Sequence, residues 1–125
     1  MARNVILDVD TGSDDACAIM LAALSEELNV LGVCAVNGNR PLSDTLTNTL
    51  KIIELLKMED KIPVGKGAAQ PLVRDLLAGR NKNPKTAEIQ LDENGEEICY
   101  HPKKFNLPEP VLKPVEENFV TWYIN

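Results

Sequence analysis

The sequence predicts an α/β fold in which a parallel sheet is built from strands joined by helical crossovers. Three apolar segments, residues 5–9, 30–36 and 62–64, are typical of strands that are buried on both faces of a sheet. Between them, apolar residues recur at spacings of three and four over residues 14–24 and 41–57, which predicts two helices. Strands that alternate with helices favour a parallel sheet, and ligands bind beyond the carboxyl ends of its strands.

Turn and capping residues set the expected limits of these elements. Ser13 precedes the first helix and is a favoured type of N-cap residue, while Pro41 suits the first turn of the second helix. An Asn-Gly-Asn segment at residues 37–39 ends the second strand. The Gly-Lys-Gly segment at residues 65–67 is expected to be a loop, and because it lacks the P-loop pattern we do not assign it phosphate binding.

The second half of the chain predicts less regular structure. A short helix is expected over residues 71–77, and polar, loop-like sequence follows it. Residues 88–92 and 96–100 predict a β-hairpin, with Asn-Gly at its turn. A last helix is expected to begin near Pro114 and to continue to residue 125.

That last helix carries an unusual concentration of aromatic side chains. Phe119, Trp122 and Tyr123 are three of the five aromatic residues of the chain. A helix face of this kind must be covered by other apolar surface. We therefore expect that the helix either is cut off at the end of the given sequence or packs on a partner, and in the second case we expect a homo-oligomer.

Length, charge and cysteine content exclude several classes of protein. A chain of 125 residues fits a single domain spanning residues 1–125, and its net charge of −6 argues against binding to nucleic acid or to an anionic membrane. Cys17 and Cys34 lie in apolar segments without a CxxC pair, so we expect buried, reduced thiols. The sequence holds no apolar run of about 18 residues. These features predict a cytoplasmic protein that does not enter membranes.

Four aspartates follow the first predicted strand or lie at its end: Asp8, Asp10, Asp14 and Asp15. Two carboxylates ~4 Å apart repel each other by about 4 kcal/mol at an effective dielectric constant of about 20. Such a cluster resists ionisation unless a cation binds among its members or some of them take up protons. Oxygen ligands of this type suit calcium or magnesium. A simpler interpretation of Asp14 and Asp15 is that they only complement the dipole of the following helix.

A further polar residue, Asn39, stands beyond the end of the second predicted strand. Asn-Gly-Asn forms a good turn by itself, so Asn39 alone predicts only a turn. Because the carboxyl ends of adjacent parallel strands meet at one edge of the sheet, we expect Asn39 to lie beside the aspartates. This placement favours a role in binding.

Three motifs in residues 4–79 resemble those of the inosine–uridine-preferring nucleoside hydrolases. The motifs are Leu7-Asp-Val-Asp-Thr-Gly-Ser-Asp-Asp-Ala16, Val36-Asn-Gly-Asn39, and Pro63-Val-Gly-Lys-Gly67 with Pro71-Leu-Val73 downstream. The resemblance implies a Rossmann-like core and a chain that corresponds to the N-terminal, truncated portion of a longer nucleoside hydrolase. It also implies that the N-glycosidic bond of a ribonucleoside is hydrolysed to free base and ribose.

The same resemblance implies a role for each acidic residue. Asp10 would be the general base and a Ca²⁺ ligand, and Asp15 would be a second Ca²⁺ ligand. Asp14 and Asn39 would contact the ribose hydroxyls, and Asp8 would support the site from behind. The chemistry is consistent with these roles, because a cation-bound water is more acidic and a nearby carboxylate can accept its proton.

The sequence departs from the family where members usually carry a His-Gly motif. The only histidine, His101, precedes a proline instead. It is either a plain residue at the end of the predicted hairpin or a displaced substrate contact.

Two alternative functions remain open at this stage. An apolar strand ending in Asp-x-Asp also resembles the phosphotransfer motif of the haloacid dehalogenase superfamily, in which Asp8 would be the nucleophile and Asp10 the acid/base, with magnesium. The other alternative is a non-catalytic truncated paralogue, or a fragment, of the nucleoside hydrolase family.

Overall fold

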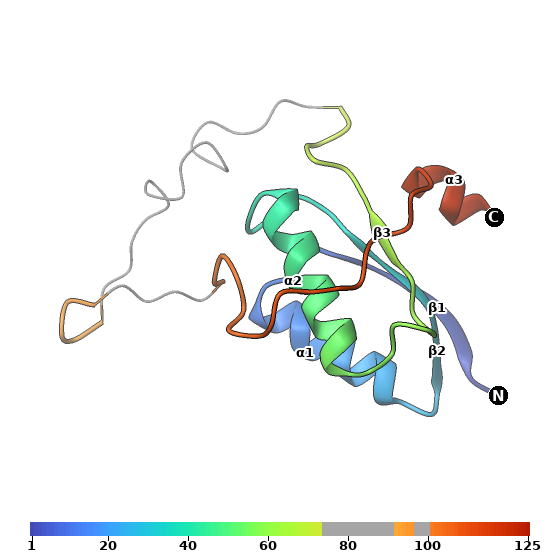
Figure 1. The fold of residues 1–125 in the computed structure, drawn as a ribbon, viewed down its shortest axis with the longest axis horizontal. Helices are drawn as coiled ribbons and strands as arrows, with labels where there is room; N and C mark the ends of the chain where they lie inside the picture. The colour runs from blue at the N-terminus through green and yellow to red at the C-terminus, as the bar shows by residue number, and fades with distance from the viewer. Residues whose placement is uncertain (74–91, 97–100) are drawn as a thin grey trace.

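The computed structural model describes residues 1–73, 92–96 and 101–125. It contains, in chain order, the six elements shown in Figure 1: β1 (Arg3–Val9), α1 (Ser13–Leu24), β2 (Leu28–Ala35), α2 (Leu42–Leu55), β3 (Val64–Lys66) and α3 (Phe119–Ile124). The three strands form one parallel sheet in the order β1-β2-β3. The predicted α/β class and parallel sheet are therefore confirmed.

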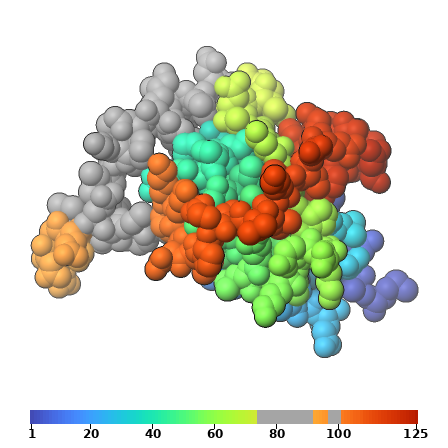
Figure 2. Space-filling view, in the orientation of Figure 1, coloured from blue at the N-terminus to red at the C-terminus, as the bar shows by residue number. Residues whose placement is uncertain are grey.

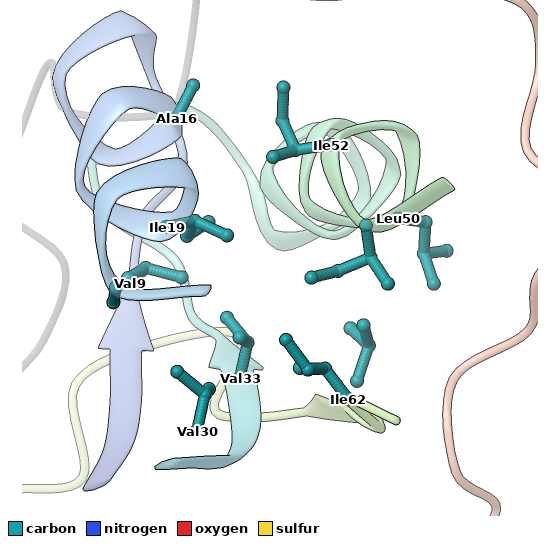
Figure 3. Packing of buried hydrophobic residues seen from close by; sticks show 11 residues of the cluster. Val9, Ala16, Ile19, Val30, Val33, Leu50, Ile52 and Ile62 are labelled. Carbon is teal, nitrogen blue, oxygen red and sulfur yellow. The ribbon is translucent and has the colours of Figure 1, made fainter. Parts of the chain in front are cut away.

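The core lies between the sheet and the pair of helices α1 and α2, which cover the same face (Figure 3). Ile19 of α1, Ile53 of α2 and Val33 of β2 are fully buried there. Both helices direct residues spaced three and four apart toward the sheet, which is why their sequences showed this periodicity. This layer fixes where the carboxyl ends of the strands lie.

The opposite face of the sheet is contacted by α3. Side chains alternate along a strand, so Gly32 points away from the face that holds Val33. A Cβ atom added to Gly32 would lie 2.2 Å from Cη2 of Trp122, and one added to Gly65 would lie 3.2 Å from Cζ3 of the same ring. The glycines therefore leave room for Trp122, and part of the aromatic face is covered within the chain.

Several expected boundaries are wrong in detail. The third strand begins at Val64 and includes Gly65, which was expected to be in a loop. The last helix begins at Phe119, five residues later than Pro114. The N-cap of α1 is Gly12 and not Ser13, and no side chain caps this helix.

Other expectations about the second half are tested only in part. Of the short helix expected over residues 71–77, residues 71–73 are described and are not helical. The hairpin turn is present, because the amide of Gly95 donates to the carbonyl of Asp92 (3.0 Å) and Gly95 has a positive φ of 81°. The arms at residues 88–91 and 97–100 lie outside the described residues.

Cys17 is exposed on α1, whereas Cys34 is buried, and both are free thiols. The burial expected for Cys17 is therefore wrong, because this residue lies on the face of α1 that points away from the sheet. Among the helices in the described ranges, none is both long enough and apolar enough to cross a membrane.

Candidate functional site

The carboxyl ends of β1 and β2 lie side by side and bring Asp10 against the Asn-Gly-Asn turn. The amide of Val36 donates to the carbonyl of Val9 (2.8 Å), which continues the pairing one residue beyond β2. Just beyond it, Oδ2 of Asp10 accepts a hydrogen bond from the backbone amide of Asn39 (2.7 Å). Asn39 thus meets Asp10 through its backbone.

Gly38 makes this contact possible. A Cβ atom added to Gly38 would lie 2.1 Å from Oδ2 of Asp10 and 2.5 Å from its Cγ, well inside contact distance. Only glycine leaves space for the carboxylate here. The sequence indicated a turn at this position, and the structure adds that the turn lies against Asp10.

Asp15 comes from the first turn of α1 and points back toward Asp10. Its Oδ2 accepts a hydrogen bond from the backbone amide of Asp10 (3.1 Å). Burial raises the pKa of Asp15 from 3.8 to about 6, assisted by a side-chain hydrogen bond with Asp10 and by the negative charges of Asp10 and Asp14. The two carboxyl groups of Asp10 and Asp15 therefore lie close enough to share a proton or a cation.

Asp14 points to a different neighbour, His101. Its Oδ1 lies 3.6 Å from Nδ1 of His101, and its side chain is 74 % exposed. The imidazole lies over Gly12, where an added Cβ would be 2.1 Å from Nδ1. Gly12 has φ −109°, which any residue can adopt, so glycine is required here for space and not for backbone conformation.

The position of His101 favours the interpretation as a displaced substrate contact over that of a plain residue at the end of the predicted hairpin. It lies beside residues 10–15, called the aspartate loop below, although 87 residues separate it from Asp14, and Nε of Arg40 donates to its backbone carbonyl (3.0 Å). Sequence reasoning left this residue undecided because no local pattern places it at the site.

Asp8 is on the other side of the sheet from the helices. Its Oδ2 accepts a hydrogen bond from the hydroxyl of Tyr123 in α3 (3.0 Å), and it pairs in register with Cys34 of β2. The pKa of Tyr123 is raised strongly, first by burial and then by the neighbouring Cys34 thiol and Asp8 carboxylate. The phenol therefore stays protonated and donates to Asp8, so Asp8 is tied to α3 while Asp10 faces Asp15.

Two buried threonines support the aspartate loop, and sequence reasoning missed both. The hydroxyl oxygens of Thr11 and Thr49 lie 2.7 Å apart, and the two residues are 1 % and 0 % exposed. This pair joins the loop after β1 to the middle of α2. Thr45 adds a bond from its hydroxyl to the carbonyl of Val36 (2.8 Å). Two threonines of α2 that are four positions apart, Thr45 and Thr49, are the signal that was available.

The donor atoms at this edge of the sheet are carboxylate oxygens, the kind of ligand that a hard cation prefers. Asp10 and Asp15 offer carboxylate oxygens, and the negative charges of Asp10 and Asp14 add to burial in raising the pKa of Asp15. Within residues 1–73, 92–96 and 101–125, no group of three or more His, Cys, Asp or Glu side chains is arranged to hold a metal ion. These two residues would therefore supply only part of a coordination shell of six to eight oxygens.

The chain resembles proteins that act on nucleosides. Residues 5–122 match the profile of the inosine-uridine preferring nucleoside hydrolases. A pyrimidine-specific ribonucleoside hydrolase RihA from Escherichia coli O7:K1 (strain IAI39 / ExPEC) is 46% identical over 114 residues, which is 91% of this chain and 32% of that protein. RihA from Shewanella sp. (strain MR-4) is 45% identical over 86 residues, covering 69% of this chain and 27% of that protein.

Solved structures of nucleoside hydrolases also resemble this chain. A purine-preferring ribonucleoside hydrolase from Gardnerella vaginalis superposes with a TM-score of 0.73 at 27% identity, covering 98% of this chain and 35% of that one. An inosine-guanosine nucleoside hydrolase superposes with a TM-score of 0.55 at 36% identity, covering 60% of this chain and 22% of that one.

The chain thus spans about a third or less of the length of the relatives that it matches. The match nevertheless extends over most of its own residues and includes the aspartate loop, so it replaces the phosphatase alternative built on Asp8 and Asp10. This chain belongs to the inosine-uridine preferring nucleoside hydrolase family.

Proposed function

We propose that this chain supplies the cation- and ribose-binding part of an enzyme that hydrolyses the N-glycosidic bond of ribonucleosides. The observation that carries the proposal is the packing of Asp10, Asp15 and the Asn39 amide at the joined ends of β1 and β2. In an open parallel sheet this edge is where ligands bind. Family membership supports the class of reaction.

Each site residue has a role in this proposal. Asp10 and Asp15 bind Ca²⁺, and Asp10 also accepts the proton of the attacking water. Asp14 accepts hydrogen bonds from ribose hydroxyls, which its exposed carboxylate can reach. Asn39 is the second ribose contact. Since its backbone amide is occupied by Asp10, its side chain is the part assigned to the sugar.

When bound, calcium would lower the pKa of a coordinated water and orient it together with the ribose hydroxyls. The remaining work falls to the residues of the chain. The amide of Asn39 holds one oxygen of Asp10, which fixes the orientation of this carboxylate. The Asp10 carboxylate would then accept a proton from the attacking water, while the sugar gains positive charge as the base departs.

The proposed substrate class is ribonucleosides in general. Relatives with pyrimidine-specific and with purine-preferring names both match this chain, which supports a role of the shared residues at the ribose, the part that both kinds of substrate have in common. We further propose a cytoplasmic homo-oligomer. Leu21 and Leu24 of α1 support the oligomer, because they are 75% and 65% exposed, and the free thiols support a reducing compartment.

The proposal is tested by ribose release from inosine and from uridine, with calcium and with a chelator. The wild-type chain is expected to release ribose only with calcium, and Asp10→Ala is expected to lose this activity. Asp60→Ala, an exposed aspartate elsewhere on the chain, is the matched control and should retain it. If neither wild type nor control releases ribose at any calcium concentration, the chain is the non-catalytic member that the sequence also allowed.

A further inference from the structure

An extended segment, residues 101–112, crosses the outer side of α2 and is called the strap below. Figure 1 shows it as the orange-to-red trace in front of α2, and Figure 2 shows it lying directly on that helix. The strap has no regular secondary structure. Its backbone polar groups must therefore find partners elsewhere.

Lys51 of α2 provides the central attachment. Although it is a lysine, it is only 3 % exposed. Its Nζ donates to the carbonyl of Phe105 (3.0 Å), to the carbonyl of Leu107 (3.1 Å) and to Oε1 of Glu109 (3.2 Å). An ammonium group has three donors, so each is used on the strap. A lysine is seldom buried in this way without such partners.

Two further side chains of α2, one turn before and one turn after Lys51, hold the rest of the strap. Asn48 is fully buried, and its Nδ2 donates to the carbonyls of Pro102 (3.4 Å) and Lys103 (3.3 Å). Its Oδ1 accepts the amide of Phe105 (3.0 Å).

At the far end, Oε1 of Glu54 accepts the amides of Val111 (2.6 Å) and Leu112. Asn48, Lys51 and Glu54 are spaced by three residues and so form a row on one face of α2. Together they bind backbone groups from Pro102 to Leu112, so these contacts are all made only when the strap lies along α2 in a single register.

The strap begins with the residue that reaches the candidate site. His101 directly precedes the first carbonyl held by Asn48, and its ring lies over Gly12 with Nδ1 at 3.6 Å from Oδ1 of Asp14. A slip of the strap by one residue would move the backbone by about 3.3 Å. His101 would then leave its place beside Asp14.

We propose that Asn48, Lys51 and Glu54 are positioning residues, which set the register of the strap and thereby hold His101 against Gly12 and Asp14. The inference rests on the proposed function, because Asp14 is assigned there to the ribose. In that setting the His101 ring flanks one oxygen of the Asp14 carboxylate, and the three α2 side chains keep the ring there through the strap.

The test compares Lys51→Met with Lys104→Met in the full chain. Both lysines contact Glu109, but Lys104 is half exposed and only Lys51 also holds the Phe105 and Leu107 carbonyls. Because His101 is the only histidine, its imidazole protons give a single set of NMR signals. The readouts are the nuclear Overhauser effect between the His101 ring and Gly12, and amide hydrogen exchange along the strap.

Wild type and Lys104→Met are expected to show the His101–Gly12 contact, and Lys51→Met is expected to lose it. In Lys51→Met the Phe105 amide should exchange about tenfold faster, while amides in the core of β2 keep their rates. A merely structural role would accelerate all amides together and leave the His101 contact in the folded fraction unchanged. Either that pattern, or wild-type behaviour of Lys51→Met, would overturn the proposal.

If Lys51→Met does not fold, a second pair of variants decides. Glu54 is less buried than Lys51, and Gln in its place still accepts both amides through its side-chain oxygen, whereas Leu does not. Glu54→Leu should weaken the His101–Gly12 contact and speed exchange at Val111 and Leu112, and Glu54→Gln should restore both. Equal behaviour of the two variants would refute the inference. None of these readouts requires turnover. A failure of this inference can therefore be distinguished from a failure of the proposed function, which is tested by ribose release.

Discussion

Replacing Asp15 with asparagine is expected to stabilise the calcium-free chain at neutral pH, although it removes a proposed cation ligand. The pKa of Asp15 is raised from 3.8 to about 6, first by burial and then by the hydrogen bond and charge of Asp10 and the charge of Asp14. Because the folded pKa lies above the unfolded one, this group favours folding fully below pH ~4. That contribution is lost as the pH rises through about 6.

The size of the effect follows from the same shift. About two pKa units correspond to a ceiling of ~3 kcal/mol, and solvent screening of this partly exposed side chain reduces the effect to about 1 kcal/mol. Asparagine stays neutral and its oxygen still accepts the Asp10 amide, so the variant avoids the loss. Asp15→Asn should therefore unfold about 4 °C higher than wild type near pH 7.5, and at the same temperature near pH 4.

The assay is thermal unfolding with and without calcium at both pH values. Calcium at about 100 times its dissociation constant should stabilise wild type by about 2.7 kcal/mol and Asp15→Asn by far less. Asp14→Asn is the matched control, because it removes the same charge from the same helical turn at a 74 % exposed side chain. The reasoning is refuted if calcium-free Asp15→Asn is less stable than wild type at neutral pH, or if calcium stabilises both equally.

Two glycine substitutions give further predictions. Gly38→Ala places a methyl group 2.1 Å from Oδ2 of Asp10, so it should displace the carboxylate, break its bond to Asn39 and weaken calcium binding by roughly tenfold in a titration. Gly32→Ala places a methyl group 2.2 Å from the Trp122 ring and should cost about 1–3 kcal/mol in urea unfolding, with tryptophan emission shifted to longer wavelength. Unchanged calcium affinity in the first variant, or unchanged emission in the second, would contradict the packing described here.

The sequence was sufficient to predict the part of the fold that local patterns encode. The apolar strands and amphipathic helices predicted the α/β layer, and the parallel arrangement then predicted that Asp10 and Asn39 would meet at one sheet edge. Their hydrogen bond confirms that placement. The roles of the individual residues in catalysis stay predictions.

Features that depend on contacts between distant residues escaped prediction. Gly65 looked like a loop residue, but it lies in β3 because its backbone pairs with Cys34 of β2, and the Trp122 ring, 57 positions later, occupies the space above it. His101 lies beside Asp14 because α2 side chains hold the strap, and no pattern near residue 101 records this. Exposure of Cys17 depended on which face of α1 meets the sheet.

Calorimetric titration of calcium into the chain tests most directly whether the acidic edge of the sheet is a cation site. Wild type is expected to bind a single calcium ion with a dissociation constant of about 10⁻⁴–10⁻³ M, as suits a shell that the described residues fill only in part. Asp10→Asn should abolish the heat of binding, and Asp60→Asn should leave it unchanged. Absence of binding to wild type, or equal binding by Asp10→Asn, would contradict the account.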